Sequence, residues 1–271
     1  MRQGDGLLLV LVLVGIGLSI VDGMTGGGVA GWFQANLPGI AQSIGGKLAL
    51  AARYLWPILT LPLIMAVLGR FIALPSAWHG FQRSLVGFIE NVTGTFGGAA
   101  RWFALGLVVV TATIVIQRYV FGFASTKLQE SVIYMHALLF LLASASTLLA
   151  DGHVRVDIFY SKASERGKAW IDLLGVYLTL IPMSALILWA STGYMNSTWR
   201  ILERSRESDG LPFVFLLKTA IPLFAVLMIL QGIAMAARSG LKLAGQATPP
   251  RPKNLGEGEV RCPRSSKSCP S

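Results

Sequence analysis

The sequence predicts an all-α, polytopic membrane protein. Hydrophobic residues make up 54% of the 271-residue chain and charged residues only 13%. A soluble globular protein carries about 25% charged residues. Long apolar runs recur along the chain, and several reach the ~20 residues that a helix needs to cross a bilayer. Because backbone within lipid must satisfy its own hydrogen bonds, these runs are predicted to be helices.

The first apolar run, residues 7–21, has two readings. As a helix it is about 22 Å long, short for a hydrocarbon core of about 30 Å. It is either a retained first span or the hydrophobic part of a signal peptide, with a candidate cleavage site at Gly28-Val29-Ala30. Its length and the wide gap to that site favour a retained helix. The glycine-rich residues 22–46 predict a loop.

Five further spans are predicted after this loop. They cover about residues 48–69, 102–117, 128–150, 169–191 and 211–237. Proline removes a backbone donor, so Pro57 and Pro62 should kink the first of these spans, and Pro182 and Pro222 should interrupt the last two. Residues 241–271 are rich in Pro, Ser, Lys and Arg and are predicted to be a disordered basic tail.

Residues 81–96 have the pattern of an amphipathic helix. Apolar side chains recur there at steps of three or four residues: Phe81, Leu85, Phe88, Val92 and Phe96. Arg83 and Glu90 interrupt the apolar character elsewhere on the helix. We expect such a helix to lie in the interface plane of the membrane.

The charge distribution predicts both termini in the cytoplasm. With the N-terminus inside and six alternating spans, most of the 23 lysines and arginines fall in inner segments and the tail. Membrane topology therefore explains the net charge of +10, and nucleic acid is not an expected partner.

A cluster of ionisable residues follows the 128–150 span: Asp151, His153, Arg155 and Asp157. As a helix, this loop pairs Asp151 with Arg155 and His153 with Asp157. As an extended segment, it places all four on one face. The loop is either an interfacial turn with internally satisfied charges or a docking surface for another membrane subunit.

Polar residues within the spans are few. His136 is predicted to be a hydrogen-bonded packing residue, and Lys218 to snorkel or to pair with Glu130 or Glu203. Loop 192–210 balances three acidic and three basic residues, as a solvated loop or an outer contact region. Nucleotide-binding, catalytic and metal-site motifs are absent, so we expect no catalytic residues, metal or cofactor. Spans without a substrate site indicate an accessory subunit.

Seven short motifs follow one another along the chain: Arg118-Tyr119-Val-Phe121-Gly122, Gln129-Glu130, Asp151 to Ser161, Glu203 to Ser208, Gly210-Leu-Pro212, Phe215-Leu-Leu-Lys218 and Leu230-Gln231-Gly232. In this order they resemble the small permease subunit of TRAP transporters, the DctQ family. The resemblance covers about residues 80–240 and is closest to the branch labelled for mannitol or chloroaromatic compounds.

The resemblance implies a function and partners. A DctQ subunit is a scaffold in the bacterial inner membrane that binds a large DctM-type permease, and a periplasmic DctP-type protein delivers the substrate. The family imports small organic acids with an ion gradient. On this view residues 76–240 are a four-span DctQ-like core, and residues 1–75 add one or two spans.

The same motifs single out candidate residues for subunit contact. These are Arg118, Tyr119, Glu130, Asp151, His153, Arg155, Asp157, Glu203, Ser205, Glu207 and Lys218. Two other functions are alternatives: a membrane redox anchor that binds haem or quinone through His136 and another histidine, and a stand-alone assembly factor. The chain has three histidines, and two are predicted outside the spans, so paired haem ligation within the bilayer is hard to build.

Overall fold

The computed structural model describes residues 4–26, 28–29, 31–43, 47, 60, 64, 76–152, 160 and 162–250. Its helices are α1 (Asp5–Met24), α3 (Ser76–Val120), α4 (Thr126–Leu149), α6 (Glu165–Gly175), the π-helix η1 (Val176–Leu180), α7 (Ile181–Ile201) and α8 (Val214–Leu243). No strand occurs in this part of the chain. The prediction of an all-α polytopic membrane protein is confirmed.

Five helices among the described residues are long and apolar enough to cross a membrane. They are α1, α3 from Trp78, α4, the continuous segment Glu165–Ile201, and α8. The predicted span 48–69 lies outside the described residues apart from two isolated positions. Residues 31–43 are helical, so the prediction of a loop over 22–46 was wrong there. Most glycines of the 22–46 stretch come before residue 32, so glycine opposes a helix only weakly over residues 31–43.

The long helix α3 joins two elements that the sequence analysis separated. Its 45 residues include both the amphipathic stretch 81–96 and the predicted span 102–117, and at 1.5 Å per residue it is about 68 Å long. Gln82, Val86, Glu90 and Thr93 form the buried face of the amphipathic part. Phe81 and Phe88 stay exposed, whereas Phe96 of the same predicted apolar stripe packs against the core.

The predicted span 169–191 belongs to a longer continuous segment. Helix α6 passes through η1 into α7, and Pro182 sits in the first turn of α7 without ending the helix. Helix α8 also continues through Pro222. Because the segment is continuous, Pro182 still removes a backbone donor, and the change to π-helix over η1 lies directly before it. In a membrane span, neighbouring helices and local π adjustments satisfy the backbone groups that a proline frees.

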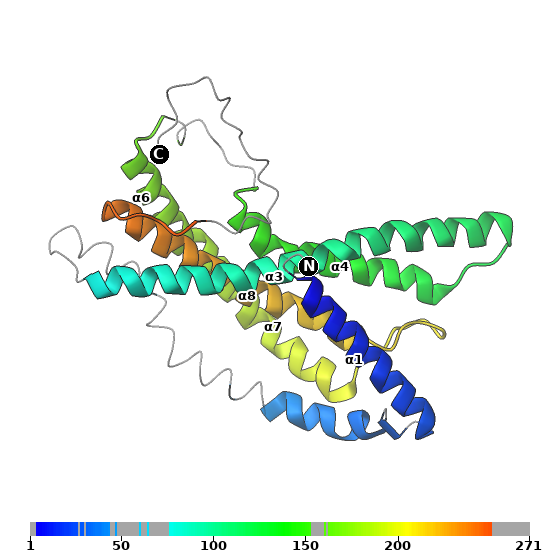
Figure 1. Ribbon diagram of the computed structural model, residues 1–271. Coiled ribbons are helices and arrows are strands. Elements are labelled where there is room, and N and C mark those ends of the chain that lie inside the picture. The colour runs from blue at the N-terminus through cyan, green and yellow to red at the C-terminus, as the bar shows by residue number, and fades with distance from the viewer. Residues whose placement is uncertain are drawn as a thin grey trace.

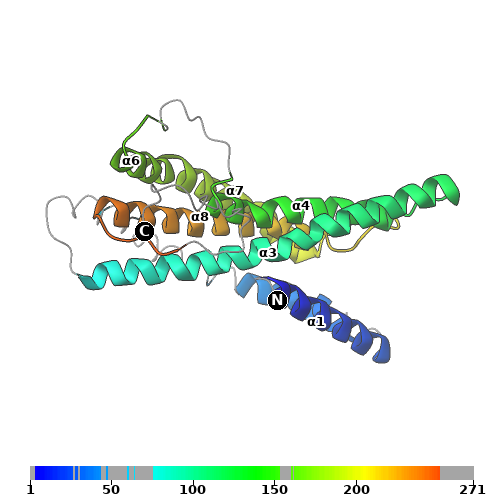
Figure 2. The same ribbon diagram turned by 45° about the horizontal axis from the view of Figure 1, so that its top comes forward.

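Helix α8 lies at the centre of the bundle (Figure 1). Along it Ala145 of α4 packs against Leu227 and Met228, and Leu173 and Val176 pack against Ala236. Helices α3 and α4 form an antiparallel hairpin, whose turn projects away from α7 and α8 in both views (Figures 1 and 2). We call this turn, residues 121–125, together with the adjoining ends of α3 and α4, the hairpin arm.

Helix α1 meets the rest of the molecule at its first turn. Asp5 forms an ion pair with Arg101 at 2.6 Å and accepts a hydrogen bond from Trp102 Nε1 at 3.1 Å. Gly4 has φ +96°, and a Cβ there would lie 2.4 Å from the backbone nitrogen of Ala99. From this point α1 runs away from α3 (Figure 2), and none of its residues is buried.

Candidate functional site

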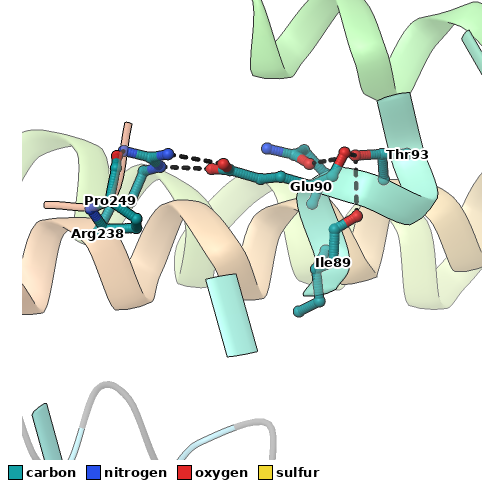
Figure 3. Close-up of polar contacts among 6 residues, drawn as sticks. Ile89, Glu90, Thr93, Arg238 and Pro249 are labelled. Carbon is teal, nitrogen blue, oxygen red and sulfur yellow. Dashed lines mark hydrogen bonds and ion pairs between the residues drawn. The ribbon is translucent and has the colours of Figure 1, made fainter. Parts of the chain in front are cut away.

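Polar side chains gather at the C-terminal end of α8. Arg238 donates from Nε and Nη2 to the two carboxylate oxygens of Glu90, the second bond being 2.6 Å long (Figure 3). Glu90 is 1% exposed. A bidentate arginine–carboxylate pair is among the stronger polar contacts in proteins, so this pair joins α3 to α8.

Two more polar residues extend this contact. Thr93 Oγ1 lies 2.9 Å from Gln231 Oε1 and 3.1 Å from the carbonyl oxygen of Ile89, and both Thr93 and Gln231 are buried (Figure 3). We call Glu90, Thr93, Gln231 and Arg238 the Arg238 cluster. Arg238 also donates to the carbonyl of Pro249 at 2.8 Å.

The start of the predicted disordered tail is ordered by these contacts. Helix α8 continues to Leu243, and Arg83 of α3 donates to Gln246 Oε1 at 3.0 Å and to the carbonyl of Ala247 at 3.2 Å. Two arginines therefore hold residues 246–249 against the bundle. Residues 251–271 lie outside the described part of the chain.

A small cavity of about 70 Å³ borders the Arg238 cluster. Its charged lining comprises Glu90, Asp151, Asp172, Arg238 and Lys242. Its other polar lining includes Tyr160, whose hydroxyl donates to Asp172 Oδ2 at 3.1 Å. Asp151 thus lies beside the cluster, at the end of α4 and with φ +60°. His153, Arg155 and Asp157 lie outside the described residues.

At the opposite end of α8, Glu130 of α4 binds the loop that joins α7 to α8. Its carboxylate accepts a hydrogen bond from Ser205 Oγ and one from the backbone N–H of Leu211 at 2.6 Å. Gly210 completes the fit, since a Cβ there would lie 2.4 Å from Ser205 Oγ and 2.7 Å from Glu130 Oε1. A side chain at position 210 would push the loop off α4.

Glu203 organises the other half of this loop. It accepts hydrogen bonds from Lys218 Nζ at 2.6 Å and from Thr198 Oγ1 at 2.9 Å. The Lys218 hydrogen bond, followed by the Thr198 hydrogen bond, lowers the pKa of Glu203 below its ordinary value. The sequence left Glu130 and Glu203 open as partners of Lys218, and in the structure Lys218 contacts Glu203.

These four residues, Glu130, Glu203, Ser205 and Lys218, are named here the Glu130 cluster. Within the loop, Ser205 N donates to the Leu211 carbonyl at 3.2 Å and Phe215 N to the Glu203 carbonyl at 3.3 Å. Lys127 and Asp209 add an exposed ion pair at 2.7 Å. The loop is therefore a closed, internally bonded turn that fastens the hairpin arm to α7 and α8.

The remaining sequence candidates lie at the edge of this cluster or apart from it. The backbone N–H of Glu207 donates to Ser205 Oγ at 3.1 Å, and the Glu207 side chain is exposed. Arg118 and Tyr119 lie in the last turn of α3, at the tip of the hairpin arm, and both are exposed.

His136 differs from its prediction as a hydrogen-bonded packing residue. It is exposed, and its ring makes an edge contact with Phe140 at a centroid distance of 4.7 Å. It forms no hydrogen bond within the described part of the chain. Its position within the span could be predicted from the sequence, but the face of α4 that the bundle leaves open could not.

The Glu90–Arg238 pair was not predicted at all. Its two residues are 148 positions apart. Each could be explained locally: Glu90 as a polar residue of an amphipathic helix, and Arg238 as part of a basic inner segment. A glutamate beside otherwise apolar residues was the available signal. Only the antiparallel packing of α3 on α8 shows its partner.

Residues 107–240 match the family model described as Tripartite ATP-independent periplasmic transporters, DctQ component. This segment is similar to the DctQ family. The match is shorter than the expected range of 80–240 and begins within α3. It gives no support to the mannitol or chloroaromatic branch. Neither a curated protein nor a solved structure matches the chain.

The matched segment contains the whole Glu130 cluster but only half of the Arg238 cluster. Gln231 and Arg238 lie inside the match, whereas Glu90 and Thr93 precede it. The polar groups of both clusters bond one another and tie helices together. Among the described residues, no group of three or more His, Cys, Asp or Glu could hold a metal ion.

Proposed function

We propose that this chain is the small permease subunit of a tripartite, ATP-independent secondary transporter. It acts as a fixed membrane scaffold for a large DctM-type permease, which takes small organic acids from a periplasmic DctP-type binding protein and moves them with an ion gradient. The DctQ domain at residues 107–240 carries this proposal. We assign no catalytic residue and no cofactor to the chain.

The two polar clusters support a scaffold role. Each cluster joins helices that are distant in the sequence: Arg238 links α8 to α3, and Glu130 links α4 to the α7–α8 loop. Buried polar groups that satisfy one another fix a single arrangement of their helices. A rigid bundle suits a subunit against which a partner moves.

We further propose that the C-terminal end of α8 faces the cytoplasm and the Glu130 cluster faces the periplasm of a bacterial inner membrane. The distribution of lysine and arginine supports this orientation. It places the exposed charges of the α7–α8 loop on the side from which a binding protein approaches.

The decisive experiment is an affinity purification of the tagged chain from native membranes in mild detergent, with mass spectrometry of the co-purifying proteins. The proposal expects a stoichiometric large polytopic permease, and loss of organic-acid uptake into cells when the chain is deleted. A chain that purifies alone, with uptake intact in the deletion strain, would contradict it.

A further inference from the structure

One face of α4 carries all its exposed residues beyond the first turn. They are Gln129, Ile133, His136, Phe140 and Thr147, and we call them the α4 stripe. Ile133 and Phe140 are each 61% exposed. Two other faces of α4 contact the bundle: Met135 and Ser146 lie against Gly106 and Gly97 of α3, and Ala145 lies against Leu227 and Met228 of α8.

The spacing of the stripe fits a partner helix. Its members follow one another at steps of four, three, four and seven residues, and the half-buried Ala143 fills the longest step. This is the repeat that packs two helices at a shallow crossing angle. From Gln129 to Thr147 the stripe is about 27 Å long, close to the thickness of the hydrocarbon core.

The chemistry of the stripe argues against lipid as its only neighbour. His136 lies about 15 Å from the first residue of α4 and about 20 Å from the last, and an imidazole is too short to reach either membrane surface. A polar side chain in mid-span generally faces protein or a water-filled cavity. Because an imidazole donates and accepts hydrogen bonds, His136 requires a hydrogen-bonding group opposite it.

We propose that the α4 stripe is the contact surface for a transmembrane helix of the large permease, with a hydrogen-bonding side chain of that helix opposite His136. This inference rests on the proposed function. A second copy of this chain is the competing occupant. The tripartite family of the DctQ domain favours the large permease.

Two variants of His136 test the hydrogen bond. Interhelical hydrogen bonds in membranes contribute about 0.6–2 kcal/mol, so His136→Leu should raise the apparent Kd for the large permease in detergent about three- to thirtyfold. His136→Asn, which keeps a donor and an acceptor, should bind close to wild type. Asn196→Leu is the matched control, since it removes an exposed polar group from α7 and should leave the Kd unchanged.

Photocrosslinking identifies the occupant directly. Benzoylphenylalanine at position 133 or 140 should yield an adduct with the large permease in native membranes. Adducts with lipid alone or with a second copy, together with an unchanged Kd for His136→Leu, would overturn the inference. Wild-type chain that still co-purifies with the large permease would then leave the proposed function standing, whereas its failure to co-purify would count against the proposed function itself.

Discussion

At the scale of single residues, charged side chains in this protein act in pairs. Glu90 and Arg238 are 2% and 12% exposed in their side chains, and each satisfies the other. Taking two charges out of water is costly, and the cost is offset only while both partners are present. The sequence shows both residues, but neither their pairing nor their burial could be read from it, because the contact joins the first and last helices of the bundle core.

Removing one member of this pair should destabilise the bundle strongly. We expect Arg238→Ala to lower the free energy of unfolding by about 3–5 kcal/mol, because it leaves Glu90 buried without its partner. Thermal and denaturant unfolding in detergent measures this change. The control is Arg83→Ala, an exposed arginine on the same side of the bundle, which should cost about 0–1 kcal/mol. Equal effects of the two variants would refute the role of the buried pair.

The lowered pKa of Glu203 predicts a loss of stability in acid. A carboxylate with a lowered folded pKa stabilises the fold above its unfolded pKa of about 4.3, and this contribution disappears as the pH falls through the folded pKa. We therefore expect the melting temperature of the wild-type protein to decrease as the pH is lowered below about 4. The fall should be smaller in Glu203→Gln. Glu207→Gln, at an exposed side chain of the same loop, should retain the wild-type profile, and a profile unaffected by Glu203→Gln would contradict this assignment.

At the scale of elements, glycine sets how closely the helices approach. The sequence analysis separated residues 81–96 from 102–117 because composition changes between them, yet α3 runs through both. Gly97 lies in the intervening segment without ending the helix. A glycine inside a helix costs about 1 kcal/mol relative to alanine, and at position 97 it permits the close contact of α3 with α4.

This contact predicts opposite effects for two glycines of α3. A Cβ at Gly97 would lie 2.0 Å from Ser146 Oγ, whereas a Cβ at Gly87 would meet nothing within 4 Å. We expect Gly97→Ala to lower the free energy of unfolding by about 1–3 kcal/mol through overpacking. Gly87→Ala should raise it by about 0.5–1 kcal/mol through helix propensity. If Gly97→Ala proved as stable as Gly87→Ala, the tight α3–α4 contact would be wrong.

At the scale of the whole molecule, the two clusters mark opposite ends of one bundle. The Arg238 cluster lies toward the C-terminal end of α8, where it joins α3 to α8. The Glu130 cluster lies at the N-terminal end of α8, where it joins the hairpin arm to the α7–α8 loop. Helix α1 adds a separate apolar span that contacts the bundle through Asp5 and Gly4. Such an arrangement leaves large apolar faces for lipid and for the proposed partner subunit.

The proposed orientation predicts which end is accessible from the periplasm. With Cys262 and Cys269 replaced by serine, Ser208→Cys in the α7–α8 loop should react with a membrane-impermeant maleimide in cells whose outer membrane has been opened. Lys162→Cys, before α6, should react only after the inner membrane is permeabilised. Both chosen positions are exposed. The reverse pattern of labelling would invert the topology and assign the Glu130 cluster to the cytoplasm.

The sequence by itself determined the class of this protein. Low charge and long apolar runs require membrane helices, because unpaired backbone is costly in lipid, and the ordered motifs predicted the similarity to the DctQ family that residues 107–240 show. Tertiary structure alone decided that α3 is continuous, that Glu90 meets Arg238, that Lys218 meets Glu203, and that His136 faces outward. Periodicity shows which residues share a helix face, but the choice of face that packs against a neighbour depends on contacts between residues distant along the chain.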